Sequence, residues 1–192
     1  VGFHMNPQSC LDDVVEILTS GNYQADEHPV LRVNAELEDG RQEELFAFND
    51  VLLERQTRQS VRFSVFLDGV LFNKFAGDGF VVATAAGSTA YNLAAGGPAV
   101  HPELAAMVVT PLYPHQAVPF SSVRFSLAVP LDRSLVFVAE DLPKRGMRLV
   151  ADGRPLDGAS RVEVLDSARR ITLLRAENMG FAEVLSRKII GG

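Results

Sequence analysis

The amino-acid sequence predicts a mainly β protein of the α+β class: an antiparallel, layered β-sandwich with a few short helices. Apolar and polar residues alternate in many short segments, which is the period of a strand with one buried face. Asp-Gly pairs at residues 39–40, 68–69 and 152–153 are turn signals between such segments. Few segments space their apolar residues as a helix does. Packing one sheet on another is the natural way to bury so many half-apolar strands.

Helices are expected at the front of the chain and near its middle. Residues 9–20 form the clearest one, which Ser9 caps and Gly21 ends, because its apolar residues recur at helical spacing. A short helix around Tyr91 is closed by the Gly-Gly-Pro of residues 96–98. Strands are expected over residues 31–37, 45–53 (interrupted at Asn49-Asp50), 61–67, 70–75, 80–84, 107–110, 123–129, 135–139, 147–151, 162–165 and 171–174, before a closing helix or strand over 181–190.

Length and composition bound the function. The 192 residues suit one domain, or one domain and a small part of another. A formal net charge of −6 argues against a nucleic-acid partner, whose phosphates need a dense Lys and Arg surface. No apolar stretch is long enough to span a bilayer and no signal peptide opens the sequence, so we expect no membrane partner and a cytoplasmic location. The single Cys10 excludes an internal disulfide framework, and the four histidines show no metal-ligand spacing.

The stretch from Gly77 to Pro102 is the most informative part of the sequence. It reads as a Gly-Asp-Gly loop, an apolar strand, and a turn of small residues that opens a short helix. Free backbone amides at such a helix start suit an anionic or sugar-phosphate ligand, and Asp78 could accept hydrogen bonds from its hydroxyl or amide groups. The stretch therefore predicts a nucleotide-type site. A hydrolase pair of Ser88 with His101 is an alternative, although serine beside glycine is more often a cap or turn residue.

These residues resemble the signature region of the NAD kinases. The run GDGFVVATAAGSTAYNLAAGGPAVHP has the family's elements in the family's order, and Ala47–Val51 and Thr110–His115 are similar to two further family motifs. The resemblance implies that residues 1–192 form the dinucleotide-binding C-terminal domain of the NAD kinase fold. It also implies the reaction: ATP, sometimes polyphosphate, phosphorylates the 2′-hydroxyl of the adenosine ribose of NAD, which gives NADP.

The resemblance further implies residue roles and partners. Asn49 and Asp50 would contact NAD, Asp78 would hold one polar end of it, and Tyr113 falls at another contact position. The ligand would be NAD or NADP, held by a homo-oligomer (dimer or tetramer) in which a neighbouring subunit contributes to the site. The full-length enzyme would use ATP and a divalent cation such as Mg. The adenosine pocket would be lined by Ser88, Thr89, Ala90, Tyr91, Asn92, Leu93 and Ala94, with Tyr91 as a stacking surface.

Departures from the family pattern leave two functional classes open. The family's catalytic Gly-Gly-Asp-Gly-Thr motif is absent from the sequence and is expected upstream of Val1, so no cofactor is assigned to motifs here and this polypeptide alone should not turn over. Ala76 stands where the family often has a basic residue, which Lys74 could replace, and an Arg-Pro pair after His115 is missing. The chain is then either the NAD-binding part of a kinase or a non-catalytic NAD/NADP-binding paralogue. A distant lipid-kinase relative is a third option.

Overall fold

The computed structural model describes residues 11–116, 121–175 and 180–191. The chain divides into two compact units, one made of residues 29–169 and the other of residues 1–28 together with 170–192. The predicted cap at Ser9 and the packing role of Cys10 lie outside the described residues. Among the described residues, no helix has the length and hydropathy that crossing a bilayer requires.

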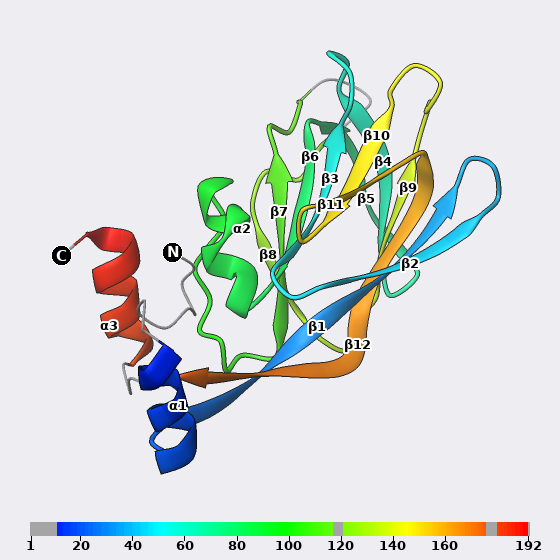
Figure 1. The fold of residues 1–192 in the computed structure, drawn as a ribbon. Coiled ribbons are helices and arrows are strands. Elements are labelled where there is room, and N and C mark those ends of the chain that lie inside the picture. The colour runs from blue at the N-terminus through cyan, green and yellow to red at the C-terminus, as the bar shows by residue number, and fades with distance from the viewer. Residues whose placement is uncertain (1–10, 117–120, 176–179, 192) are drawn as a thin grey trace. The chain divides into compact units, whose positions relative to one another are not determined.

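Twelve strands and a few short helices make up the described chain (Figure 1). They are α1 (Leu11–Ser20), β1 (Gln24–Leu37), β2 (Gln42–Ala47), β3 (Asp50–Arg55), β4 (Val61–Leu67), β5 (Val70–Gly77), β6 (Gly79–Thr84), the 3-10 helix η1 (Ala86–Thr89), α2 (Tyr91–Ala94), β7 (Ala106–Leu112), β8 (Leu127–Pro130), β9 (Leu135–Ala139), β10 (Met147–Ala151), β11 (Arg154–Asp157), β12 (Ala159–Arg175), α3 (Phe181–Leu185) and the π-helical turn η2 (Ser186–Ile190).

The strands form two six-stranded sheets. One has the order β2-β1-β12-β9-β4-β5 and the other the order β11-β10-β3-β6-β7-β8, and the strand pairs with an assigned register are antiparallel. A mainly β, antiparallel architecture with few helices was predicted, and the structure confirms it.

The hydrophobic core lies between the two sheets. Phe63, Phe75 and Phe137 come from the first sheet, Phe80 comes from the second, and all four side chains are almost fully buried. The Phe75 and Phe80 ring centroids are 4.3 Å apart, and those of Phe80 and Phe137 are 5.2 Å apart. Tilted aromatic pairs at these separations stabilise the fold beyond the free energy gained by burying the rings. The cluster therefore joins the two sheets into the predicted sandwich.

Two of the predicted Asp-Gly turns are two-residue hairpin loops. Asp68 and Gly69 both have positive φ (50° and 78°), as do Asp152 and Gly153 (44° and 79°). The flanking pairs, Leu67 with Val70 and Ala151 with Arg154, are in register. Such turns need positive φ at both central residues, which Asp tolerates and Gly favours.

Several predicted boundaries were wrong because spacing along the chain does not reveal strand partners. The expected strand over 45–53 is two strands that belong to different sheets, β2 and β3, and the chain crosses between them at Phe48-Asn49. The expected strands over 162–165 and 171–174 are one long strand, β12. The expected strand over 123–129 begins only at Leu127. The structure also adds β11, which the prediction lacked. Residues 181–190 are helical, which is one of the two predicted alternatives.

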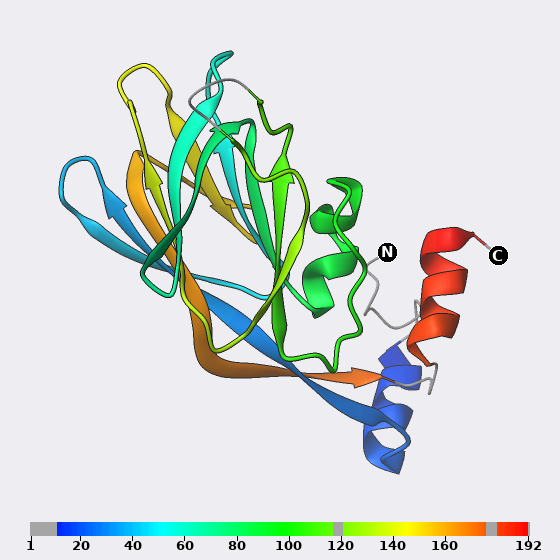
Figure 2. The ribbon, with the colours of Figure 1, turned by 180° about the vertical axis from the view of Figure 1, so that it is seen from behind.

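The middle of the second sheet is covered on both faces. Every residue of β6 is buried, and β7 is buried after its first residue. One face of these strands belongs to the core, and the helical turns η1 and α2 contact β6. Figures 1 and 2 show the two turns as green coils alongside the second sheet. Strands covered on both faces carry near-continuous apolar runs, as β6 does. The Gly-rich stretch is therefore packed onto the sheet rather than held out as a free loop.

Candidate functional site

The chain crosses from β2 to β3 at Phe48–Asp50, which we call the crossing loop. One carboxylate accepts hydrogen bonds from all three residues of this loop. Asp152, in the turn between β10 and β11, accepts the backbone N–H of Phe48 (2.6 Å), of Asn49 (2.8 Å) and of Asp50 (3.2 Å). The N–H of Asp152 donates in return to the Asp50 carbonyl (3.1 Å). Hydrogen bonds to an ionised carboxylate are about twice as strong as neutral ones. The predicted Asn49-Asp50 motif thus sits in a loop with a defined conformation.

The small-residue turn after β6 packs directly on this loop. Thr84 donates its N–H to the Asn49 carbonyl (2.9 Å) and its hydroxyl to the Phe48 carbonyl (2.7 Å), and its Oγ1 accepts the N–H of Gly87 (2.8 Å). A Cβ added to Gly87 would lie 2.0 Å from the Asn49 carbonyl oxygen. Only glycine allows backbones to approach so closely. Residues predicted from two separate motifs are therefore brought together.

Asp50 is the titratable group at the centre of this arrangement. Its side chain is half-buried, and desolvation raises the pKa of the Asp50 carboxyl to about 6. The charge of Asp152 adds to the rise, and a hydrogen bond from the Tyr91 backbone N–H opposes it. The first amide of α2 is therefore already bonded to a carboxylate. This amide is therefore not free for the anionic or sugar-phosphate ligand that the sequence suggested, whereas the Asp50 carboxylate can accept a hydrogen bond from a hydroxyl.

Ser88 and Asn92 are fully buried. The Ser88 hydroxyl donates to the Ala85 carbonyl (2.7 Å) and accepts the N–H of Val100 (2.8 Å). Ser88 therefore has the bonding of a turn residue, which is the role that the sequence favoured over a nucleophile.

Asn92 joins α2 to two other segments. Its amide nitrogen donates to the carbonyls of Ser88 (2.9 Å) and Pro98 (3.0 Å), and its oxygen accepts the Thr110 hydroxyl (2.7 Å). A Cβ on Gly97 would lie 2.1 Å from that oxygen. The two N–H groups and the oxygen of the Asn92 amide are thus bonded within the protein, so this side chain fixes α2 in place rather than pointing to solvent.

The remaining predicted residues of this stretch are accessible. Ala90, Tyr91 and Ala94 are exposed, and Thr89 and Leu93 are half-buried. Tyr91 keeps 46% of its surface exposed while its backbone N–H is bonded to Asp50. The structure therefore brings Asn49, Asp50 and an accessible aromatic ring to one end of β3, which we call the Asp50 end.

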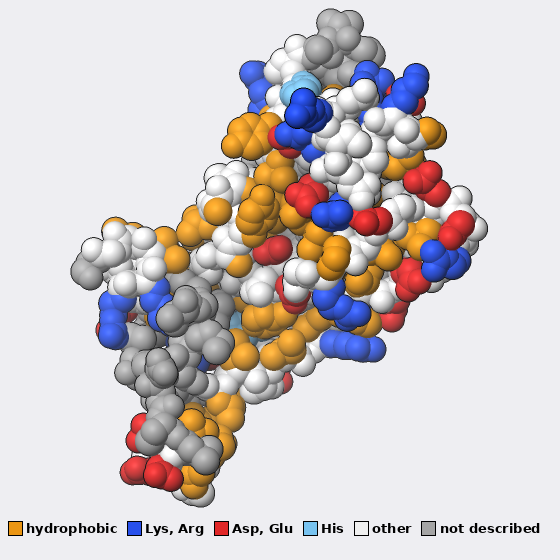
Figure 3. Space-filling view, turned by 45° about the horizontal axis from the view of Figure 1, so that its top comes forward, with side chains coloured by type: hydrophobic (Ala, Val, Ile, Leu, Met, Phe, Trp, Pro, Cys, Tyr) orange, Lys and Arg blue, Asp and Glu red, His pale blue; other side chains and the backbone are white. Residues whose placement is uncertain are grey.

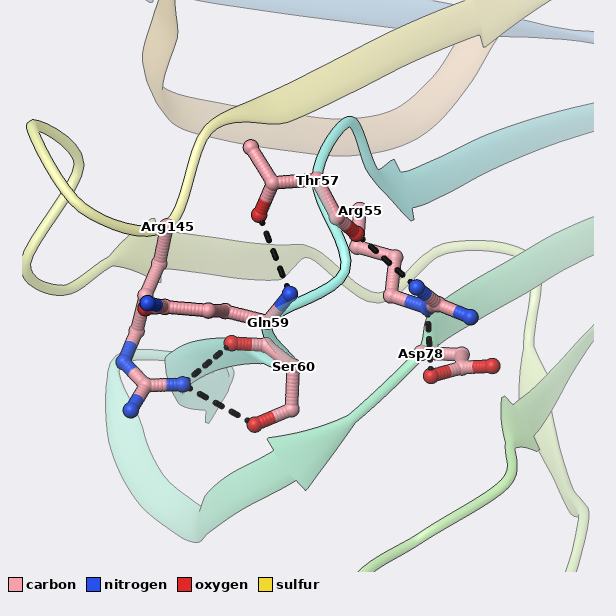
Figure 4. A network of polar contacts seen from close by, with 6 residues as sticks. All are labelled: Arg55, Thr57, Gln59, Ser60, Asp78 and Arg145. Carbon is pink, nitrogen blue, oxygen red and sulfur yellow. Dashed lines mark hydrogen bonds and ion pairs between the residues drawn. The ribbon is translucent and has the colours of Figure 1, made fainter.

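Asp78 and Tyr113 lie at the other end of the same strands. The Asp78 N–H donates to the Leu112 carbonyl (2.9 Å), and its carboxylate pairs with Arg55 at 2.7 Å between Nε and Oδ1. Figure 4 shows the Arg55 guanidinium between Asp78 and the Thr57 carbonyl, which accepts Nη1 at 2.8 Å. We call this group the Asp78 end.

The two ends are separated by the length of a strand. Asp50 and Arg55 are the first and last residues of β3, which has six residues, so the ends are about 17 Å apart at the usual strand rise. Tyr113 is 78% exposed and has a positive φ of 41°, which is uncommon for a bulky residue. The predicted site is therefore two groups within one chain rather than a single cluster.

Two charged residues of these groups were missed by sequence reasoning. Arg55 pairs with Asp78, and the two residues meet because β3 lies beside β6 in the second sheet. Asp152 holds the crossing loop from a hairpin about 100 residues away in the chain. The only sequence signal for Asp152 was its Asp-Gly turn, which predicts a hairpin but not what the carboxylate contacts. In the part of the chain that the structure describes, no group of three or more His, Cys, Asp or Glu residues could hold a metal ion.

Comparisons with known proteins point to one family. The family described as "ATP-NAD kinase C-terminal domain" matches residues 48–125, which include both ends. The chain is 35% identical over 184 residues to an NAD kinase of Chlorobium luteolum, covering 94% of this chain and 62% of that protein. It is 32% identical over 186 residues to an NAD kinase of Clostridium beijerinckii, covering 95% and 63%. The chain thus spans about three fifths of the length of these curated relatives.

Solved structures show the same fold. A yeast NADH kinase crystallised with NADH superposes with a TM-score of 0.82 at 22% identity, over 94% of this chain and 52% of that chain. An NAD kinase from Archaeoglobus fulgidus in complex with ATP superposes with a TM-score of 0.69 at 22% identity, over 91% and 65%. At this identity the likeness establishes the fold, so residue roles must be argued from the contacts above.

Proposed function

Because the chain belongs to the family of ATP-NAD kinase C-terminal domains, we propose that it binds NAD for phosphorylation. The 2′-hydroxyl of the adenosine ribose would be the acceptor, ATP or polyphosphate the donor, and NADP the product. The relatives named NAD kinase, which match over most of this chain, support the proposal.

The observation that carries the proposal is the Asp50 end. An ionised Asp50 offers a carboxylate to hydroxyl donors, and the adjacent Tyr91 offers an accessible ring to a base. A ribose next to a base presents both groups at adjacent positions. Asn49 adds a side-chain amide from the same loop, where its backbone N–H is bonded to Asp152. We therefore assign the adenosine or nicotinamide riboside half of the dinucleotide to this end, with Thr89, Ala90, Leu93 and Ala94 as the accessible wall and Ser88 and Asn92 as its buried support.

The Asp78 end supports a homo-oligomer. Asp78 and Tyr113 are about a strand length from Asp50, so we propose that a neighbouring subunit brings its Asp78 end to the Asp50 end of this one. Tyr113 and Phe125 are 78% and 64% exposed, as expected of residues that contact another protein, and Figure 3 shows apolar side chains exposed among charged ones on one face. Dinucleotide binding would then require assembly.

Phosphoryl transfer requires parts that this sequence does not supply. The Gly-Gly-Asp-Gly-Thr motif is absent from it, and the described residues form no cluster that would hold a divalent cation by themselves. Transfer depends on positioning the donor and neutralising its charge. We therefore propose that this polypeptide alone binds the dinucleotide without turnover, which also fits the alternative of a non-catalytic NAD/NADP-binding protein. An assay of NADP formation with ATP or polyphosphate as donor tests this proposal, because product formed by this polypeptide alone would contradict it.

Replacing the ring of Tyr91 tests the proposed binding site. Tyr91→Ala should weaken NAD binding by roughly 5- to 150-fold, because stacking of a base on an aromatic side chain contributes about 1–3 kcal/mol. Tyr23→Ala is the matched control, since Tyr23 is similarly exposed (39%) and belongs to the other unit. Fluorescence or calorimetric titration measures both. Equal affinity of Tyr91→Ala and the parent protein would reject Tyr91 as a base platform.

A further inference from the structure

Asp152 belongs to neither predicted motif, yet it makes more contacts to the crossing loop than any other side chain described above. We propose that Asp152 is a positioning residue, which holds the Phe48–Asp50 loop in the form that presents Asn49 and Asp50 to the dinucleotide. The inference rests on the proposed function of the Asp50 end.

The geometry of the turn makes Asp152 a rigid anchor. It lies in a two-residue hairpin loop with Gly153, and β10 is paired with β3 so that Ala151 lies opposite Val51. The carboxylate is therefore fixed beside the first residues of β3. One oxygen accepts the Phe48 N–H and the other accepts the N–H groups of Asn49 and Asp50, at 2.6 to 3.2 Å.

Two of the three residues that Asp152 holds lie outside the strand ladders. Phe48 and Asn49 fall between β2, which belongs to the first sheet, and β3, which belongs to the second. Backbone N–H groups at such a crossing need acceptors that a ladder does not provide. An ionised carboxylate with two oxygens can serve all three at once, whereas a neutral side chain offers fewer acceptor positions.

Asp152 also contributes, after burial, to the raised pKa of Asp50. The groups that face the Asp50 carboxyl are Asp152 from the β10–β11 turn and the Tyr91 N–H from α2. The negative charge of Asp152 raises the pKa of Asp50, so its removal should let Asp50 ionise at lower pH. A general loss of stability would not by itself move this titration, so the titration reports on the local surroundings of Asp50.

Asp152→Asn tests the proposal with Asp157→Asn as its control. Asparagine tolerates the positive φ of 44° at this position, so the turn should survive. Asp157 lies at the end of the same hairpin and bonds Arg148 and Gln56, away from the crossing loop. In the full chain we would measure NAD and NADP affinity from pH 5 to 8, and hydrogen exchange of the Phe48, Asn49 and Asp50 amides without ligand.

The proposal predicts a distinct result for each readout. Asp152→Asn should weaken NAD binding at neutral pH about tenfold or more, which is about 1.4 kcal/mol. The pH below which affinity falls should move lower than in the parent protein, and the three amides should exchange faster. Asp157→Asn should leave all three readouts within about twofold of the parent, since exposed charge pairs contribute little.

Two outcomes overturn the inference. One is parent-like affinity and pH dependence in Asp152→Asn. The other is rapid exchange of the three amides in the parent protein, which decides the matter even if the variant fails to fold. If the parent binds neither NAD nor NADP, the proposed function fails instead, while the amide measurement still shows whether Asp152 orders the loop.

Discussion

At the scale of single residues, Asp50 lowers the free energy of unfolding and has a proposed role in binding. Burial raises the pKa of its carboxyl from 3.8 to about 6, so the folded protein binds more protons than the unfolded chain between about pH 4 and 6. The free energy of unfolding therefore falls as the pH rises through that window and stays lowered above it. A half-buried charge kept at such a position is typical of sites where function opposes stability.

Asp50→Asn should remove this cost. Above pH 6 we expect a melting temperature higher by a few degrees, or about 1 kcal/mol after allowance for solvent screening, since the side-chain oxygen can still accept the Tyr91 N–H. The advantage should shrink as the pH falls and vanish near pH 4. NAD affinity should fall at the same time, because a neutral amide is a weaker acceptor for hydroxyls. A stability difference that is constant from pH 4 to 8 contradicts this explanation.

Gly87 is the other residue whose identity the site requires. Gly87→Ala places a Cβ 2.0 Å from the Asn49 carbonyl oxygen and 2.4 Å from its carbon, so the crossing loop must move. We expect a loss of about 1–3 kcal/mol in stability and a weakening of NAD binding. Gly180→Ala is the control, because nothing lies within 4 Å of its Cβ position. Chemical denaturation measures the stability of both variants, and equal effects would argue against close contact of the two backbones.

At the scale of elements, α2 depends on tertiary bonds rather than on its own length. It has four residues, too few for an isolated helix to be stable. Asn92 ties it to the Pro98 carbonyl and to the Thr110 hydroxyl of β7, and η1 and α2 contact β6. The wall of the Asp50 end is thus fixed by the sheet beneath it.

Asn92→Asp tests that dependence with almost no change in shape. A carboxylate cannot donate, so the carbonyls of Ser88 and Pro98 lose their donor in a fully buried place. The expected cost is about 2–4 kcal/mol. Asn22→Asp makes the same chemical change at an exposed residue and should cost less than about 0.5 kcal/mol. If urea denaturation gave the two variants similar midpoints, the Asn92 bonds would not support α2.

The sequence predicted where strands and hairpins lie better than it predicted which strands pair. Alternation located most strands, and Asp-Gly pairs located the hairpins at residues 68–69 and 152–153, because both signals are local. The division of residues 45–53 between two sheets and the length of β12 depend on which strands pair, which alternation does not encode. For the same reason Arg55 and Asp152 were missed, since sheet pairing brings them to Asp78 and the crossing loop.

At the scale of the whole molecule, the separation of the two ends makes assembly part of the binding hypothesis. The Gly77–Pro102 stretch was predicted as a nucleotide-type site. In the structure, one part of this stretch lies beside the start of β3 and another part lies beside its end. If subunits share a site, one intact Asp50 end and one intact Asp78 end on different chains should be enough to bind one NAD molecule.

Mixing two damaged proteins tests shared sites. Tyr91→Ala damages the Asp50 end and Tyr113→Ala damages the Asp78 end, and each alone should bind NAD weakly. After subunit exchange in a dimer, half of the dimers contain one of each chain, and each of these has one intact site, so about one quarter of the sites should recover. Calorimetric site number and analytical ultracentrifugation measure the outcome. A mixture no better than its components would place each site within one chain.

The most direct test of the account is a calorimetric titration of the full chain with NAD, NADP and ATP under conditions where its oligomeric state is known. The account predicts saturable binding of NAD or NADP by the oligomer, with affinity lost in Tyr91→Ala and retained in Tyr23→Ala. ATP should bind more weakly than either dinucleotide. ATP binding tighter than NAD and NADP, or no dinucleotide binding by an assembled oligomer, would contradict it.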